Sequence, residues 1–255
     1  MTIETKLSSS LKILGLIGIR SGSKGVPNKN IRPLAGKPLV GWVVSAAQST
    51  RNINRLIVST DSEEYATVAR SLGAEVPYLR PADLALDGSA EFDYVRHMLD
   101  WLKANEGYRP DIVVRMMATV PLQASMDIDA VIDILCNDPS AQSAVVIAEA
   151  RQHPMKALKI VPDGSGGHKL VSYFGDSGRE VTPIARQSYD KAYFRANVIA
   201  CRREVVYETA SLTGDVVRYH IIPQERAIDI DNLVDFLIAE KLIESMTVSL
   251  DGTTN

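Results

Sequence analysis

The sequence has little cysteine, no excess of basic residues and no long hydrophobic run. Its two cysteines among 255 residues, Cys136 and Cys201, each lie inside an apolar stretch. They suit neither a disulfide framework nor a zinc site, so a reducing compartment is expected. The formal net charge of −3 argues against a surface for duplex nucleic acid, because such surfaces carry an excess of Lys and Arg. A small anionic ligand is not excluded, since the local placement of Arg and Lys decides its binding.

The sequence contains no stretch that could span a bilayer. The longest apolar run near the N-terminus, Ile13 to Ile19, has the length of a strand and contains two glycines. The preceding Met1 to Ser10 are polar and lack the hydrophobic core of a signal peptide. We therefore expect a cytoplasmic protein without a membrane partner, with flexible tails at residues 1–10 and 247–255.

Short apolar runs alternate with helical patterns through the first 150 residues. Strands are expected at Ile13–Ile19, Leu56–Val58, Ile112–Met117 and Ser143–Ala148. Between them, apolar residues recur with helical spacing after Pro38, from Tyr65 to a C-terminal cap at Gly73, from Val95 to Leu102, and after a cap at Ser125. This alternation predicts an α/β fold, a Rossmann-like, mainly parallel sheet with helices on both faces.

The alternation breaks between Arg151 and Tyr193. The turn-forming residues 162–167 separate Leu158–Val161 from Lys169–Tyr173, which predicts a β-hairpin. A lone hairpin is marginally stable in water and needs a surface to pack on. Later in the chain, strands are expected at Val198–Cys201 and Val217–Ile222, followed by a helix whose apolar face includes Leu233, Phe236 and Leu237.

The loop after the first strand carries the strongest chemical signal. Parallel sheets bind ligands beyond the carboxyl ends of their strands, which selects residues 20–30, 59–62 and 118–123. The first of these loops contains Arg20, Lys24 and Lys29 around a flexible Gly22. Inward-turned backbone N–H groups and three cations favour a polyphosphate ligand. The loop matches neither of the common glycine-rich phosphate motifs, and a solvated basic loop is the alternative interpretation.

An ordered series of segments resembles the acylneuraminate cytidylyltransferase family, which makes CMP-sialic acid and related CMP-nonulosonates. The series comprises Arg20-Ser21-Gly22-Ser23-Lys24-Gly25-Val26-Pro27-Asn28-Lys29-Asn30, Ser59-Thr60-Asp61, Arg80-Pro81-Ala82-Asp83-Leu84, His153-Pro154-Met155-Lys156, Arg186-Gln187, Phe194-Arg195-Ala196-Asn197 and Ile228-Asp229-Ile230-Asp231. Several ordered motifs are more specific than one loop. The resemblance implies one nucleotidyltransferase domain over residues 12–245. It also implies a hairpin insertion at 155–193 that reaches a partner subunit in a homodimer.

The resemblance assigns most of these residues to the nucleotide. It implies that Arg20, Lys24 and Lys29 hold the triphosphate of CTP, within a loop that also presents Ser21, Gly22 and Ser23. Asn30 and Arg80 would lie near the nucleotide, and Ser59 and Asp61 beside the nucleoside. Asp61 has an alternative role as the cap of the helix that carries Tyr65. Arg20, Lys24 and Asp229 are the expected catalytic residues.

The resemblance also implies a Mg²⁺ site at Asp229 and Asp231. On an extended segment, side chains two residues apart project from one face, so both carboxylates can face the same ion. Carboxylate and phosphate oxygens are the ligands that Mg²⁺ prefers. The alternative for Asp231 is to cap the helix that follows it.

The segments expected to bind the sugar depart from the family pattern. Lys156 and Arg195 would face a sugar carboxylate, and Arg186, Gln187 and Asn197 would lie nearby. The usual Gln-Pro-Thr-Ser-Pro-Leu-Arg segment is here Met117-Ala118-Thr119-Val120-Pro121-Leu122-Gln123, and the usual Asn-Gly is Asn197-Val198. Met117, Thr119 and Gln123 therefore give this wall a different, partly apolar character.

The expected activity is transfer of CMP from CTP to the anomeric hydroxyl of an acidic nine-carbon sugar, with release of pyrophosphate. Alignment and charge neutralisation would lower the barrier, because no Ser-His-Asp or Cys-His set is evident. A 3-deoxy-octulosonate cytidylyltransferase is the alternative within the same class. A non-catalytic nucleotide-sugar binding protein is the alternative from another class.

Overall fold

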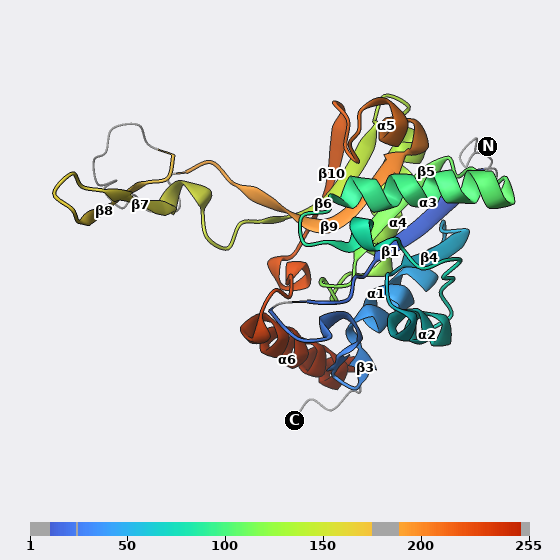
Figure 1. The fold of residues 1–255 in the computed structure, drawn as a ribbon, viewed down its shortest axis with the longest axis horizontal. Helices are drawn as coiled ribbons and strands as arrows, with labels where there is room; N and C mark the ends of the chain where they lie inside the picture. Colours follow the sequence, from blue (N-terminus) through green and yellow to red (C-terminus); the bar gives the residue numbers. More distant parts are fainter. Residues whose placement is uncertain (1–10, 24, 175–188, 251–255) are drawn as a thin grey trace.

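A six-stranded sheet forms the centre of the molecule (Figure 1). The computed structural model describes residues 11–23, 25–174 and 189–250, the last four as backbone alone. In sheet order the strands are β10 (Val217–Ile222), β6 (Ser143–Glu149), β9 (Tyr193–Arg202), β5 (Ile112–Met117), β1 (Ile13–Gly18) and β4 (Arg55–Ser59). Neighbours are parallel except β9, which runs antiparallel to both β5 and β6. The expected α/β fold with a mainly parallel sheet is therefore confirmed.

Helices cover both faces of the sheet. They are α1 (Leu39–Gln48), α2 (Glu63–Ser71), α3 (Glu91–Glu106), α4 (Ser125–Asn137), α5 (Arg203–Glu208) and α6 (Leu233–Leu250). The first face packs on α1, α2 and α4, and the second on α3 and α5. In β1, Ile13 and Ile17 belong to the first core, whereas Leu14 and Leu16 belong to the second. A strand buried on both sides has no polar face, which explains its continuous apolar run.

A third, smaller core anchors α6 beside the start of α1. Phe236, Ala239 and Ile243 of α6 pack with Leu34 and other buried residues. The expected apolar face was only partly right, because Leu233 and Leu237 are exposed. The helix continues to Leu250, into the segment expected to be a flexible tail from residue 247, whereas residues 1–10 and 251–255 lie outside the described part. The short elements are β2 (Pro33–Leu34), β3 (Lys37–Pro38) and the 3₁₀ turns Lys29–Ile31, Ala82–Ala85, Pro154–Lys156 and Gln224–Ala227.

The predicted hairpin is present and projects from the body of the molecule (Figure 1). Its strands, β7 (Leu158–Pro162) and β8 (His168–Ser172), are antiparallel. Gly164 and Gly166 have φ of 84° and 92°, a backbone conformation that favours glycine at this turn. The returning strand β9 begins at Tyr193, five residues before the expected Val198, and so connects the hairpin to the sheet. None of the helices in the described ranges combines the length and hydrophobicity that a bilayer crossing requires.

A fully buried carboxylate ties the start of α4 to the turn that precedes residues 229–231. Asp127 accepts hydrogen bonds from the Arg226 guanidinium (3.0 Å) and the Ala124 N–H (3.3 Å), and it contacts His220 Nε2 (3.3 Å). The expected cap at Ser125 is wrong. Ser125 is the first residue of the helix, and the Asp127 side chain binds the N–H of residue 124 instead.

We expect Asp127→Ala to lower the free energy of unfolding by about 3 kcal/mol or more, because it leaves a largely buried guanidinium without its carboxylate. Asp133 on the same helix is the control. Both side chains of its ion pair with Arg51 are exposed, so Asp133→Ala should lower the free energy of unfolding by less than about 1 kcal/mol. Urea unfolding followed by circular dichroism measures both. Equal costs for the two variants would contradict the anchoring role of Asp127.

Candidate active site

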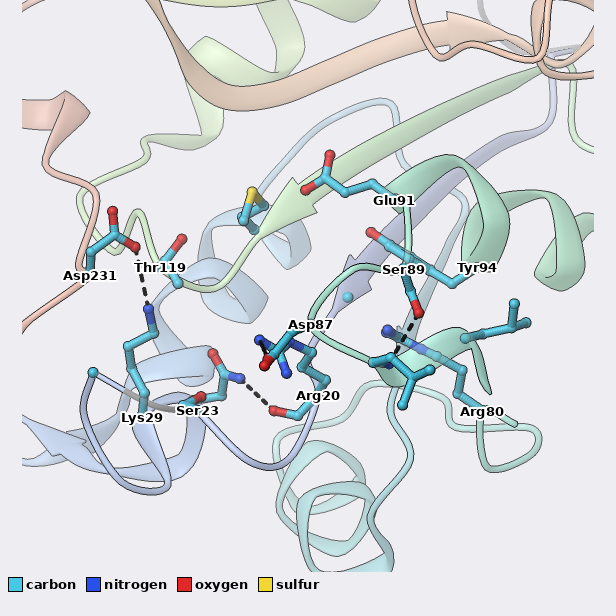
Figure 2. Close-up of a pocket in the computed structure, with 16 residues that line it drawn as sticks. Arg20, Ser23, Lys29, Arg80, Asp87, Ser89, Glu91, Tyr94, Thr119 and Asp231 are labelled. Carbon is cyan, nitrogen blue, oxygen red and sulfur yellow. Dashed lines mark hydrogen bonds and ion pairs between the residues drawn. The ribbon is translucent and has the colours of Figure 1, made fainter. Parts of the chain in front are cut away.

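A cleft of about 360 Å³ lies at the carboxyl ends of β1 and β5. Figure 2 shows Lys29 and Asp231 on one side of this cleft and Arg80 and Tyr94 on the other. The lining comes from the loop after β1, the segment between α2 and α3, the start of α3, the end of β5 with the loop after it, and the segment before α6. Loops from distant parts of the chain thus meet where the topology of a parallel sheet predicts a ligand site.

Internal hydrogen bonds hold the first loop in shape. The Asp61 carboxylate accepts from the Ser21 N–H (2.8 Å) and the Ser21 hydroxyl (2.5 Å). The buried Asn30 donates its amide to the carbonyl of Arg20 (3.1 Å). Gly22 has a φ of 74° and open space around it, as the sequence suggested for this position. Lys24 lies outside the described residues.

Asp61 binds the first loop rather than a helix end. Burial raises the pKa of Asp61, but the two hydrogen bonds from Ser21, together with its own backbone N–H and the charge of Arg80, bring the pKa below its usual value. Asp61 does not cap α2, because Ser62 occupies that position and its hydroxyl accepts from the Tyr65 N–H (3.4 Å). The ionised carboxylate therefore stabilises the loop that it faces.

The same loop makes close contact with residues 229–231. A Cβ atom at Gly25 would lie 2.1 Å from the carbonyl oxygen of Asp231, so no larger residue fits without movement of the backbone. Lys29 Nζ donates to the carbonyl of Ile230 and lies 3.7 Å from an Asp231 carboxylate oxygen. From the other side, the Ile230 N–H donates to the Thr119 carbonyl (2.8 Å). Two loops therefore hold this segment in one place.

Two arginines lie among the charged residues of the cleft, whose lining also contains Lys29 and the carboxylates of Asp87, Glu91 and Asp231. Arg20 forms an ion pair with Asp87 (2.7 Å) at the cleft surface. Arg80 is buried, donates to the hydroxyl (3.1 Å) and the carbonyl (2.6 Å) of Ser59, and stacks over Tyr94 with 4.2 Å to the ring centroid. Burial lowers the pKa of Arg80 and raises that of Tyr94 to about 12, so the arginine remains the charged partner.

The carboxylates of Asp229 and Asp231 are unlike each other. Asp231 lines the cleft and its side chain is 80% exposed, whereas Asp229 is largely enclosed and accepts from the Asn197 amide (2.6 Å). Burial raises the pKa of Asp229, and the nearby charge of Asp231 adds to that rise. Asp231 is not the cap of α6, since the Asn232 side chain accepts from the N–H groups of Val234 and Asp235.

The donor set suits a hard cation that receives further ligands from elsewhere. Within the described ranges, Asp229 Oδ1 and Thr119 Oγ1 are buried and form no hydrogen bond of regular geometry. Across the same ranges, no cluster of three or more His, Cys, Asp or Glu side chains could enclose a metal ion. Two carboxylates with an unused oxygen fit Mg²⁺, which rarely takes an all-protein cage and is completed by phosphates and water.

A second hollow of about 350 Å³ lies on the other side of residues 229–231. Asp229 lines this hollow together with Phe194, Arg195 and Arg151. Two guanidinium groups beside a concave surface can bind a carboxylate. Asp231 therefore faces the first cleft, while Asp229 borders the second hollow.

The structure separates the residues expected to bind sugar. Met117 and Thr119 line the first cleft and Arg195 lines the second hollow. Asn197 binds Asp229, Gln123 is buried behind both surfaces, and Lys156 is exposed at the base of the hairpin. Arg186 and Gln187 lie outside the described residues. The ligand roles of all these residues remain predictions.

Several lining residues were missed in the sequence. Asp87, Glu91 and Tyr94 border the first cleft, and Arg151 borders the second hollow. In the sequence, only their position indicated that these residues could line a site, since they lie in the polar segment after Arg80 and in the loop after β6. A charged residue inside an apolar strand, Arg115 in β5, was a stronger signal, because buried charges need partners.

The fold and the cleft at the carboxyl ends of β1 and β5 define an α/β protein with a candidate ligand site, and comparison with known proteins gives its family. Residues 14–212 match the family model described as "Cytidylyltransferase". The chain is 32% identical to "Post-translational flagellin modification protein B" of Campylobacter coli over 236 residues, which are 91% of this chain and 95% of that protein. It is 30% identical to "CMP-N,N'-diacetyllegionaminic acid synthase" of Campylobacter jejuni over 241 residues, 93% and 97% of the two chains.

A solved structure agrees in fold. The synthetase of CMP-2-keto-3-deoxy-manno-octonic acid, complexed with CTP, superposes with a TM-score of 0.65 at 15% identity, over 92% of this chain and 99% of that one. The chain belongs to the cytidylyltransferase family. The family expected from the sequence is therefore confirmed.

We expect Gly25→Ala to weaken CTP binding at least tenfold, about 1.4 kcal/mol, because the new methyl group would displace the loop from the Asp231 carbonyl. Gly88→Ala is the matched control. Gly88 lies in the exposed loop beside Asp87, and its Cβ would meet no atom within 4 Å. Isothermal titration calorimetry measures both variants. Unchanged binding in Gly25→Ala would show that the close approach is dispensable.

Proposed function

We propose that the protein transfers CMP from CTP to the anomeric hydroxyl of a nonulosonic acid and releases pyrophosphate. The observation that carries this proposal is the arrangement around residues 229–231. Asp231 faces a cleft lined by Arg20, Lys29 and Arg80, and Asp229 borders a hollow whose lining includes two arginines. A triphosphate in the cleft and an acidic sugar in the hollow would meet beside the two carboxylates.

The first cleft suits the nucleotide. Arg20, Ser23 and Lys29 would contact the triphosphate, with Lys24 on the same loop, and Arg80 would lie on the nucleoside side. The Arg20 guanidinium can exchange the Asp87 carboxylate for a phosphate oxygen without crossing the cleft. Because these groups sit on hydrogen-bonded loops, little rearrangement is needed to oppose the developing charge.

Asp229 and Asp231 would hold Mg²⁺ against the triphosphate. When bound, the ion neutralises phosphate charge and orients the phosphates. The chain itself supplies the position of the carboxylates, through Asn197 on Asp229 and Lys29 on the 230–231 segment. In the reaction the anomeric hydroxyl loses its proton to solvent, its oxygen forms a bond to the α-phosphorus, the bond between the α-phosphorus and the bridging oxygen breaks, and pyrophosphate leaves with that oxygen.

The second hollow suits the acidic sugar. Arg195 and Arg151 would bind the carboxylate of the acceptor, which would place its anomeric hydroxyl toward Asp229. A nine-carbon sugar is favoured over 3-deoxy-octulosonate, because the legionaminic acid synthase is similar over nearly the whole chain. The octulosonate synthetase shares the fold at a much lower identity. A cytoplasmic location, where CTP is available, stays a prediction.

The projecting hairpin supports a homodimer. Leu158, Ile160 and Leu170 share one face of β7–β8 and are 55%, 70% and 61% exposed, and Tyr173 and Phe174 are further exposed aromatic residues at the end of the hairpin. A two-stranded arm with such a face needs a partner surface in water. A second copy of the chain would supply it, and Lys156 at the base of the arm would then act in the partner's site.

The wild-type enzyme should release pyrophosphate with CTP and a nonulosonate, and not with GTP or without sugar. Lys24→Ala should abolish this release, because it removes a phosphate-binding cation. Arg195→Met should raise the KM for the sugar at least tenfold and leave the KM for CTP within about twofold, since the lost bond is to the carboxylate.

Arg96→Met, on the exposed side of α3, is the control and should change neither constant. A coupled pyrophosphate assay measures all four proteins against a panel of nonulosonates and 3-deoxy-octulosonate. Equal turnover with GTP would overturn the cytidine assignment. Binding of CTP without turnover on any sugar would favour the non-catalytic alternative.

Ile160→Asp and Leu170→Asp should convert the dimer to a monomer, because a buried carboxylate on the shared face is costly. Lys169→Asp, which changes the opposite face of the same hairpin, should leave the dimer intact. Light scattering after size exclusion gives the mass in each case. A wild-type protein with the mass of one chain would refute the dimer.

A further inference from the structure

Arg115 is a buried arginine in the middle of the central sheet. It lies in β5 two residues before Met117, and it is 3% exposed. Its neighbours along the strand, Val114 and Met116, are buried and apolar. A guanidinium in such a place is costly unless its donors are satisfied, and while its Nε is buried without a hydrogen bond, its two terminal nitrogens have partners that indicate its use.

The two ends of the guanidinium bind residues on different sides of β5. One terminal nitrogen forms an ion pair with Glu91 (2.6 Å), the first residue of α3, which lines the first cleft. The other donates to the backbone carbonyl of Asn197 in β9 (3.2 Å). Arg115 therefore joins the wall of the cleft to the strand that leads to the second hollow.

Asn197 has an unusual backbone conformation. Its φ is 57°, in the left-handed region, which asparagine adopts more readily than other residues with a side chain. Asn197 also lies in a bulge. Val145 of β6 pairs with Ile199 of β9, and Ile147 pairs with Arg195, so three residues of β9 lie between these pairs where β6 has one. Bulges redirect side chains, and this one directs the Asn197 amide to Asp229 Oδ2 (2.6 Å).

We propose that Arg115 is a positioning residue for Asp229. By binding the carbonyl of Asn197, it holds the bulge in the conformation in which the Asn197 amide takes one oxygen of Asp229. The second oxygen, Oδ1, is thereby left for the cation. This inference rests on the proposed function, because it gives Asp229 the role of metal ligand, and it adds the residue that determines the direction of that ligand.

A space-filling role alone would not need a charged side chain. An apolar residue of similar length would fill the same volume without the cost of burying charge. The contacts of Arg115 instead form a continuous series, from Glu91 through Arg115 and Asn197 to Asp229. Each step lies between the two hollows at which nucleotide and sugar would bind.

Two substitutions test the proposal. Arg115→Met keeps the volume and removes the donors, whereas Arg115→Lys keeps the charge for Glu91 but cannot bind two partners as a planar fork. Both should lower kcat at least tenfold, weaken Mn²⁺ binding at least tenfold in the presence of a non-hydrolysable CTP analogue, and leave the KM for CTP within about twofold. Electron paramagnetic resonance of Mn²⁺ reports on the site without turnover.

Arg202→Met is the matched control. Arg202 lies at the far end of β9 and donates to the carbonyls of Ala141 and Leu135, so its loss tests the general effect of removing an enclosed arginine. It should alter neither kcat nor Mn²⁺ binding. In an Asn197→Gly background, Arg115→Met should cause no further loss, because the amide that it positions is absent.

Wild-type levels of kcat and Mn²⁺ affinity in both Arg115 variants would overturn the positioning role. The role would also be overturned if Arg115→Met lowered kcat in the Asn197→Gly background as much as in the wild type, because Arg115 would then act independently of Asn197. Failure of the wild-type enzyme to release pyrophosphate would instead refute the proposed function. The proposed function is therefore tested on the wild-type enzyme, and the positioning role of Arg115 on its variants.

Discussion

The close contact between the first loop and residues 229–231 is the constraint on which the site depends. Gly25 brings the backbone of the loop against the Asp231 carbonyl, and Lys29 binds the carbonyl of Ile230. These contacts join segments about 200 residues apart, so the folded sheet must form before the site exists. Since the loop carries basic side chains and the later segment carries carboxylates, their contact determines where an anion and a cation could lie together.

Much of the fold could be predicted because its causes are local. The continuous apolar run of β1 follows from cover on both faces, and the 3.6-residue pattern of α1 follows from one buried stripe. The buried face of α6 was harder, since Leu233 and Leu237 continue an apolar pattern but remain exposed. Periodicity identifies an apolar stripe, but it does not tell which of two such stripes the rest of the chain covers.

The residue types of the site were predictable, whereas their partners were not. Asp61 was expected beside a nucleoside or at a helix end, and its carboxylate binds Ser21, 40 residues earlier. Asn197 was expected to face sugar, and its amide binds Asp229. Such pairings depend on how strands are ordered in the sheet, in particular on the antiparallel β9 and its bulge. Short-range spacing carries no information about that order.

The cations of the cleft are already paired with groups of the protein, and this affects which ligand can bind. A phosphate that contacts Arg20 competes with the Asp87 carboxylate for the same guanidinium, so only the difference between the two interactions contributes to affinity. A single phosphate gains this difference at one cation only. A triphosphate that contacts Arg20 and Lys29 together gains affinity from both contacts, while the entropy cost of immobilising the ligand is incurred only once. Paired cations therefore disfavour small anions and favour a ligand that spans the whole loop.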